Sequence, residues 1–249
     1  MIHGGRIVAE KETSPPDPAS RPRRVDGEDL ALALLAYVFA LVIFLALATL
    51  LAPEDSASPV RVLFYLAANS LAALTAVSAC LIAPARATFT SLGLSRVSAR
   101  WLALGVLGGL IVPLSAFALL VASYAAFVSL SGEEPPSRGA TDPLQAVPEN
   151  LASGIILLVF ICVVAPVAEE LLFRGVLYGY LRRWRMILAL AISSVVFGIV
   201  HGGFLLIYVV AGIIFALLYE RSGSLWPSIA AHATNNTLIM VSLVIPGLL

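Results

Sequence analysis

The sequence LALALLAYVFALVIFLALATLLA, residues 30–52, contains 23 consecutive residues without a charge. A helix needs about 20 predominantly apolar residues to cross the ~30 Å hydrocarbon core of a bilayer. The apolar part of a signal peptide is shorter, at about 7–15 residues. The run therefore predicts a membrane-spanning helix that stays in the protein.

Six further apolar runs follow the first one along the chain. Hydrophobic residues make up 60% of the 249 residues and charged residues 12%, about half of the ~25% usual for soluble domains. The sequence therefore predicts an all-α fold, a polytopic membrane helical bundle of about seven to eight transmembrane helices. The net charge of zero gives no indication of a nucleic-acid partner. The six runs cover residues 62–83, 101–130, 151 to about 181, 186–201, 204–219 and 226 to about 246.

The polar ends of the chain and its loops predict organisation and orientation. Residues 1–29 are rich in proline and charge and predict a disordered cytoplasmic tail, while residues 30–249 predict a single transmembrane helical domain. With the N-terminus in the cytoplasm, twelve of the fifteen basic residues fall on the cytoplasmic side, as the positive-inside rule requires. Only one of the fifteen is lysine, which suits a GC-rich bacterial genome. We expect an integral protein of a bacterial inner (cell) membrane.

Small residues at helical spacing predict close helix packing. Gly105 and Gly109 lie four apart in one run, and Gly212 and Ala216 lie four apart in another. Small side chains let two helix backbones approach each other within a membrane.

The buried charges and imidazoles occur only after residue 165. A charge at the centre of a membrane helix costs about 2.5–3.5 kcal/mol on insertion, so each such residue is a candidate for function. At ~1.5 Å per residue from the arginine-rich helix ends, Glu169 and His232 lie at about 18 and 16 Å. His201 and Asn236 lie at about 24 and 22 Å. All four reach one layer of the bundle, as a shared site requires.

Spacing gives the two adjacent glutamates different roles. Glu170 and Arg174 are four residues apart, so they can pair and reduce the cost of burying either charge. Glu169 is rotated by about 100° and has no such partner on its own helix, which makes it the candidate general base. The alternative is that all three form one interhelical polar clamp.

Two further motifs supply imidazole and amide groups. His201 follows Phe197 by one helical turn, and Phe197 is read as a packing residue. His232 and Asn236 are also one turn apart, so both can point at one oxygen, although Asn235 is a rival for that role. A histidine that is simply hydrogen-bonded within the bundle is the alternative for His201.

A carboxylate, a histidine that shares its proton and two donors for an oxyanion form a hydrolase constellation. Other routes to hydrolysis in a membrane leave motifs that this sequence lacks. It has no H-E-x-x-H pair of a zinc protease and no G-x-S-x-G serine elbow. No aspartate falls within a predicted span, so paired aspartates are also excluded.

The three motifs, in this order, resemble the CPBP intramembrane proteases. That group contains the type II CAAX prenyl endopeptidases, the Abi proteins and bacteriocin-processing or immunity proteins. The resemblance covers about residues 150–240, whereas the first three runs match only in being hydrophobic. The motifs stand here as EELLFR (Glu169, Glu170, Arg174), FGIVH (Phe197, His201) and HATNN (His232, Asn236).

The resemblance implies an intramembrane endopeptidase that cleaves a membrane-anchored peptide or protein at a cavity open to the membrane and cytosol. Glu169 with His201 would activate water, His232 with Asn236 would stabilise the oxyanion, and Glu170 and Arg174 would shape the site. The same four residues, Glu169, His201, His232 and Asn236, would hold a divalent metal such as zinc if one were used. We favour metal-free hydrolysis, because amide and carboxylate oxygens are not the soft ligands that zinc prefers.

Two functions from other classes compete with hydrolysis. A non-catalytic membrane scaffold or bacteriocin-immunity protein would keep the polar residues for folding or partner binding. A proton-coupled transporter would use Glu169, His201 and His232 as a relay. The sequence has no evident internal repeat, which disfavours the transporter.

Overall fold

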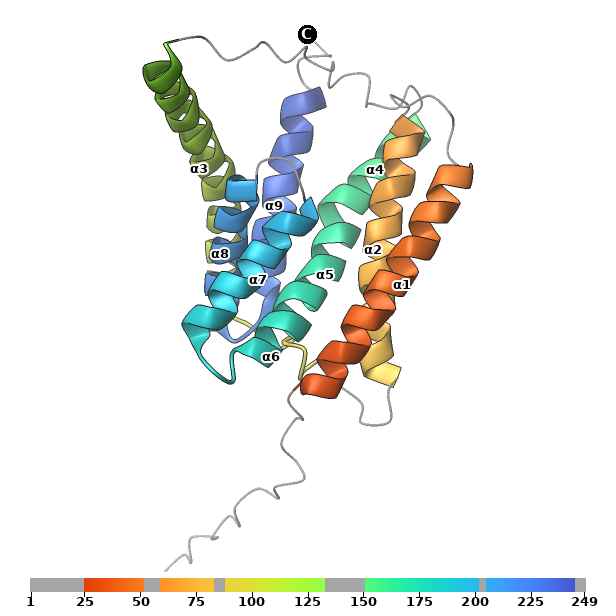
Figure 1. Ribbon diagram of the computed structural model, residues 1–249. Helices are drawn as coiled ribbons and strands as arrows, with labels where there is room; N and C mark the ends of the chain where they lie inside the picture. Colours follow the sequence, from red (N-terminus) through yellow and green to blue (C-terminus); the bar gives the residue numbers. More distant parts are fainter. Residues whose placement is uncertain (1–24, 52–58, 83–87, 133–150, 202–204, 245–249) are drawn as a thin grey trace, which may run out of the picture.

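The computed structural model describes residues 25–51, 59–82, 88–132, 151–201 and 205–244 (Figure 1). The described part is almost entirely helical and contains no strand, which confirms the all-α membrane bundle. Residues 1–24 of the predicted tail and the predicted helix ends at 52, 83, 204 and 246 lie outside the described residues. The α-helices are α1 (Gly27–Leu51), α2 (Pro59–Ile82), α3 (Ala99–Ser131), α4 (Leu151–Val159), α5 (Ala165–Glu170), α6 (Gly179–Leu181), α7 (Met186–His201), α8 (Leu205–Ser222) and α9 (Leu225–Val244).

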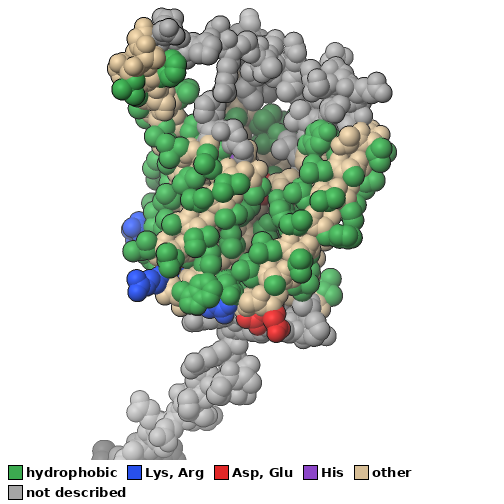
Figure 2. All heavy atoms as spheres, in the orientation of Figure 1, with side chains coloured by type: hydrophobic (Ala, Val, Ile, Leu, Met, Phe, Trp, Pro, Cys, Tyr) green, Lys and Arg blue, Asp and Glu red, His purple; other side chains and the backbone are tan. Residues whose placement is uncertain are grey.

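Four of the described helical stretches are long and apolar enough to cross a membrane, namely α1, α3, Gly154–Leu181 and α8. α7 and the stretch Ala67–Ile82 of α2 are shorter apolar helices. α9 is not among the four, in keeping with its many polar residues. Figure 2 shows hydrophobic side chains covering the side of the bundle, with the Lys and Arg side chains gathered near one end. The protein is an integral membrane protein.

The first helix begins at Gly27, before the predicted start at Leu30. Oδ1 of Asp26 accepts hydrogen bonds from the backbone N–H groups of Glu28 and Asp29, at 2.9 and 3.0 Å. Oδ2 of Asp29 in turn accepts the N–H of Asp26 at 2.9 Å. This reciprocal cap satisfies donors that have no partner in the first turn of a helix. Residues 27–29 of the predicted tail are therefore helical.

α1 and α2 form an antiparallel pair, and α2 packs on α5, which belongs to the fourth span (Figure 1). On the other side of that span, α7, α8, α9 and α3 pack on one another. Glycines set the close approach of α3 to α9, because a Cβ on Gly105 or Gly109 would lie 2.4 Å from a carbonyl oxygen of Pro227 or Ala231. A Cβ on Gly212 of α8 would lie 2.9 Å from a backbone atom of α7. The predicted close packing at these glycines is confirmed.

The fourth span is a continuous helical rod in which two π-helical segments, Phe160–Val164 and Leu171–Tyr178, flank α5. In the first segment the N–H of Ala165 bonds to the carbonyl of Phe160, five residues earlier. The next donor in this register would be Pro166, which has no N–H, so the carbonyl of Ile161 is left for another partner. Wide turns of this kind are frequent at functional sites.

Candidate active site

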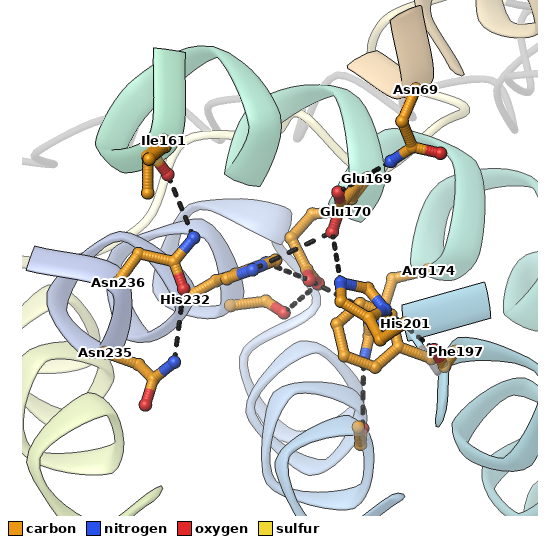
Figure 3. Close-up of polar contacts among 12 residues, drawn as sticks. Asn69, Ile161, Glu169, Glu170, Arg174, Phe197, His201, His232, Asn235 and Asn236 are labelled. Atoms are coloured by element: carbon orange, nitrogen blue, oxygen red, sulfur yellow. Dashed lines mark hydrogen bonds and ion pairs between the residues drawn. The ribbon is translucent and has the colours of Figure 1, made fainter. Parts of the chain in front are cut away.

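Glu169 is at the centre of a cluster of polar side chains from four helices (Figure 3). Its side chain is buried on α5, and Oε2 lies 3.2 Å from Nε2 of His201 and 3.8 Å from Nε2 of His232. Oε1 accepts a hydrogen bond from Nδ2 of Asn69 on α2 at 3.1 Å. Glu169 has no partner on its own helix, as expected, but α2, α7 and α9 each bring a side chain to it.

In each histidine, the hydrogen-bond partner of Nδ1 determines which ring nitrogen carries the proton when the imidazole is neutral. Nδ1 of His201 is 2.8 Å from the carbonyl oxygen of Phe197, and Nδ1 of His232 is 3.1 Å from Oε1 of Glu170. A carbonyl and a carboxylate only accept, so each Nδ1 carries a hydrogen. When neutral, both imidazoles therefore turn a lone pair on Nε2 toward Oε2 of Glu169. At 3.2 Å, Glu169 and His201 form a hydrogen bond only if one proton lies between them.

Glu170 and Arg174 form the predicted ion pair, and both side chains are completely buried. Nη1 of Arg174 donates to Oε1 of Glu170 at 2.8 Å, and Nη2 donates to the carbonyl of Gly212 at 3.1 Å. The hydroxyl of Ser228 donates to Oε2 of Glu170. The guanidinium also lies 4.4 Å from the ring centroid of Phe197, within reach of a cation–π interaction. Glu170 is thus bonded to α9 as well as to Arg174 on its own helical rod.

Asn236 donates one amide hydrogen to a backbone carbonyl of the fourth span. Its Nδ2 donates to the carbonyl of Ile161 at 2.9 Å, and its Oδ1 accepts from Nδ2 of Asn235 at 3.2 Å. The asparagine thus supplies the donor that Pro166 lacks. A primary amide has two N–H groups, so one further hydrogen remains on Nδ2 for another acceptor. Asn235, the rival residue, holds the Asn236 side chain.

A pocket of about 250 Å³ brings the candidate residues to one surface. The ring of His201 stacks on Tyr208 with centroids 4.8 Å apart and contacts Phe197 at 4.1 Å. The ring of His232 stacks on Phe215 at 4.9 Å. Glu170 and Arg174 lie behind this surface rather than in it. The pocket is lined by Ile161, Ala165, Glu169, Phe197, His201, Tyr208, Ala211, Phe215, His232, Asn235, Asn236, Ile239 and Met240.

The pocket lies toward the end of the bundle that is opposite to the arginine-rich turn at residues 182–185. His201 is the last of the 16 residues of α7, about 24 Å of helix beyond that turn. Tyr208 lies in the first turn of α8, at the same end. With a cytoplasmic N-terminus, His201 and Tyr208 would lie nearer the non-cytoplasmic side of the membrane than the arginine-rich turn.

The donor groups do not fit the four-residue metal set. The carboxamide of Asn236 faces Ile161 and Asn235 instead of joining Glu169 and the two histidines. Within the described ranges, no group of three or more His, Cys, Asp or Glu side chains is placed to hold a metal ion. We therefore derive no step of the chemistry through a metal.

Two polar contacts of the site were missed by the sequence analysis. Asn69 is a polar residue in the middle of the second apolar run, and that position is the only signal of its role. Ser228 precedes His232 by one helical turn, a spacing that could have placed it on the same face as the histidine. Neither residue belongs to the three motifs.

Comparisons with known proteins match the C-terminal part of the chain. Residues 151–238 match the family model described as type II CAAX prenyl endopeptidase Rce1-like, which confirms the resemblance read from the three motifs. The chain is 35% identical over 112 residues to "Putative membrane peptidase YdiL" of Bacillus subtilis (strain 168), covering 44% of this chain and 43% of that protein. It is 34% identical over 77 residues to "UPF0177 protein YxdF" of Lactococcus lactis subsp. lactis (strain IL1403), covering 30% and 42%.

The chain thus spans less than half the length of both curated relatives. No solved structure matches it. The matched segment contains all seven candidate site residues and begins after α1, α2 and α3. At the level of the family, the matches support a membrane protease.

Proposed function

We propose that the protein is an intramembrane endopeptidase that hydrolyses a peptide bond of a membrane-anchored substrate. The observation that supports it most is the convergence of two Nε2 atoms, from His201 and His232, on one oxygen of Glu169 in the wall of a pocket. A buried acid–base group next to a space for substrate is what general base catalysis needs.

In the proposed reaction, Glu169 and His201 act together as the base. The form of the pair that reacts has no proton between Glu169 and His201. It takes a proton from a water molecule in the pocket, and the water oxygen forms a bond to the carbonyl carbon of the substrate. The same proton then passes to the amide nitrogen as the C–N bond breaks. Phe197 and Tyr208, whose rings contact the imidazole, hold His201 in the orientation that this transfer requires.

His232 and Asn236 are proposed to stabilise the tetrahedral oxyanion. The free amide hydrogen of Asn236 is one donor. His232 is the second, and it can donate from Nε2 only as an imidazolium because its Nδ1 hydrogen faces Glu170. Glu170 accepts the Nδ1 hydrogen of His232 and so holds the imidazole ring in place, which is how Glu170 acts on the reaction. Preorganised donors of this kind are typically worth about 10²–10³ in rate each.

A comparison of new protein termini tests the proposal directly. Membranes of cells that express the wild type or Glu169→Gln, at equal protein levels, would be searched for termini present only with the wild type. We expect such termini, within or beside hydrophobic segments. Identical sets of termini in the two strains, with both proteins folded, would contradict the proposed activity.

A membrane scaffold is the second candidate, because Glu170 alone bonds to Arg174, Ser228 and His232 and so ties the fourth span to α9. A scaffold would need this network and would not need Glu169. In that case Glu170→Gln would lower the amount of folded protein, and Glu169→Gln would leave the cellular phenotype unchanged.

A further inference from the structure

A polar chain outside the three motifs leads from α1 through α2 to Glu169. The hydroxyl of Tyr37 on α1 donates to Oδ1 of Asn69 on α2 at 2.8 Å. Nδ2 of Asn69 donates to Oε1 of Glu169 at 3.1 Å. Figure 3 shows Asn69 reaching Glu169 from a different helix than either histidine. Both helices lie outside the segment that the family model matches.

Each of these two hydrogen bonds has only one possible direction. A carboxylate oxygen accepts, so Asn69 must turn its NH₂ group toward Glu169. Its carbonyl oxygen is then left to face Tyr37, whose hydroxyl must donate. Tyr37 is 9% exposed, and its hydroxyl holds the carbonyl oxygen of the Asn69 side chain in place.

We propose that Asn69, held by Tyr37, is a positioning residue for Glu169, an inference that rests on the proposed function. Asn69 occupies Oε1 of the carboxylate, so that only Oε2 faces the histidines and the pocket. Without this bond the carboxylate group can rotate about its last side-chain torsion, and the proton-accepting oxygen is no longer fixed. The reaction requires that oxygen at a defined distance from His201 and from the attacking water.

The first test is kinetic. The full-length protein in nanodiscs would be assayed with a synthetic peptide that spans a cleavage site found by the terminus comparison. For Asn69→Ala we expect kcat to fall by about 10–100-fold, as when outer-shell partners of metal-binding side chains are removed, with KM changed by less than about threefold. Tyr37→Phe should reduce kcat less. Tyr37→Phe should add nothing to Asn69→Ala, because the tyrosine acts through the amide.

Ser70→Ala is the matched control for this series. Ser70 is the next residue of α2, its side chain is fully buried, and its hydroxyl has no hydrogen-bond partner in the described structure. Its kinetics should therefore equal those of the wild type. Wild-type kcat in Asn69→Ala overturns the proposal. So does a lower melting temperature of Asn69→Ala with unchanged kcat per folded molecule, because that result makes Asn69 purely structural.

An infrared measurement separates this inference from the proposed function. The carboxyl bands of Glu169 are those that disappear in the difference spectrum between the wild type and Glu169→Gln. We expect Asn69→Ala to shift these bands and Ser70→Ala to leave them unchanged. Equal cleavage by the wild type and Glu169→Gln would contradict the endopeptidase. Unshifted bands in Asn69→Ala would contradict the contact between Asn69 and Glu169, whatever the activity.

Discussion

Substituting Glu170 by glutamine should unfold the bundle far more readily than the same change at Glu169. Glu170 and Arg174 are both completely buried, with N and O 2.8 Å apart. Glutamine keeps the shape of the side chain and removes its charge, so Arg174 is left as a buried cation. Removing one partner of a buried ion pair costs about 3–5 kcal/mol of stability, because the other charge stays buried without compensation. That is a large part of the ~5–15 kcal/mol by which proteins are typically stable.

The Glu169→Gln variant is the matched control. Its amide can keep an oxygen toward Asn69 and turn NH₂ toward the Nε2 lone pairs that His201 and His232 carry when neutral. The new contacts are therefore favourable, and we expect the free energy of unfolding to change by no more than about 1 kcal/mol, the net worth of a typical hydrogen bond. The same substitution would thus lower stability at Glu170 and leave it nearly unchanged at the proposed catalytic residue Glu169.

The free energy of unfolding would be measured by steric trapping in bicelles for the wild type, both single variants, Arg174→Met and the double variant Glu170→Gln/Arg174→Met. The double variant should be more stable than Glu170→Gln alone, because it removes the uncompensated cation. A loss below about 1 kcal/mol in Glu170→Gln, or no recovery in the double variant, would contradict the expected cost of an unpaired buried Arg174.

Three further predictions concern packing, backbone and orientation. Gly105→Ala should destabilise the protein by about 1–3 kcal/mol in the same measurement, because its methyl group would overlap a carbonyl of α9, whereas Gly154→Ala, with no atom within 4 Å of its Cβ, should not. Asn236→Ala should cost about 0.5–1.5 kcal/mol, because it removes the hydrogen bond to the half-buried carbonyl of Ile161. Adding Pro166→Ala should restore part of that loss, since alanine supplies an N–H, and full additivity would contradict this account. Trp184 is 61% exposed near the basic end. The cysteine of a Trp184→Cys variant should react with a membrane-impermeant thiol reagent only after cells are opened. Labelling of this cysteine in intact cells would reverse the proposed orientation.

The sequence was informative where local spacing decides the contact. Glu170 and Arg174 pair because they are four residues apart on one helical rod, and no tertiary information is needed. The layer shared by Glu169, His201 and His232 follows from counting helical rise from arginine-rich ends, because a membrane bundle keeps its helices roughly parallel.

The contacts that the sequence did not predict depend on how helices pack and on backbone register. Asn69 meets Glu169 across 100 residues of chain, and a lone polar residue in an apolar run does not identify its partner. One amide hydrogen of Asn236 goes to Ile161 because Pro166, two residues after a π-helical turn, has no N–H for that carbonyl. No side-chain pattern shows that turn.

The contact between Asn69 and Glu169 also bears on how the chain is built into the membrane. Helices enter the bilayer in the order in which they are synthesised, so α1 and α2 are in place before the span that carries Glu169 leaves the ribosome. An unaccompanied carboxylate is costly to leave in lipid. The Asn69 side chain, hydrogen-bonded to Tyr37, offers an amide N–H group to this carboxylate. On this view α1 and α2 receive the span that carries Glu169 during membrane insertion. A chain without these two helices would insert that span less efficiently.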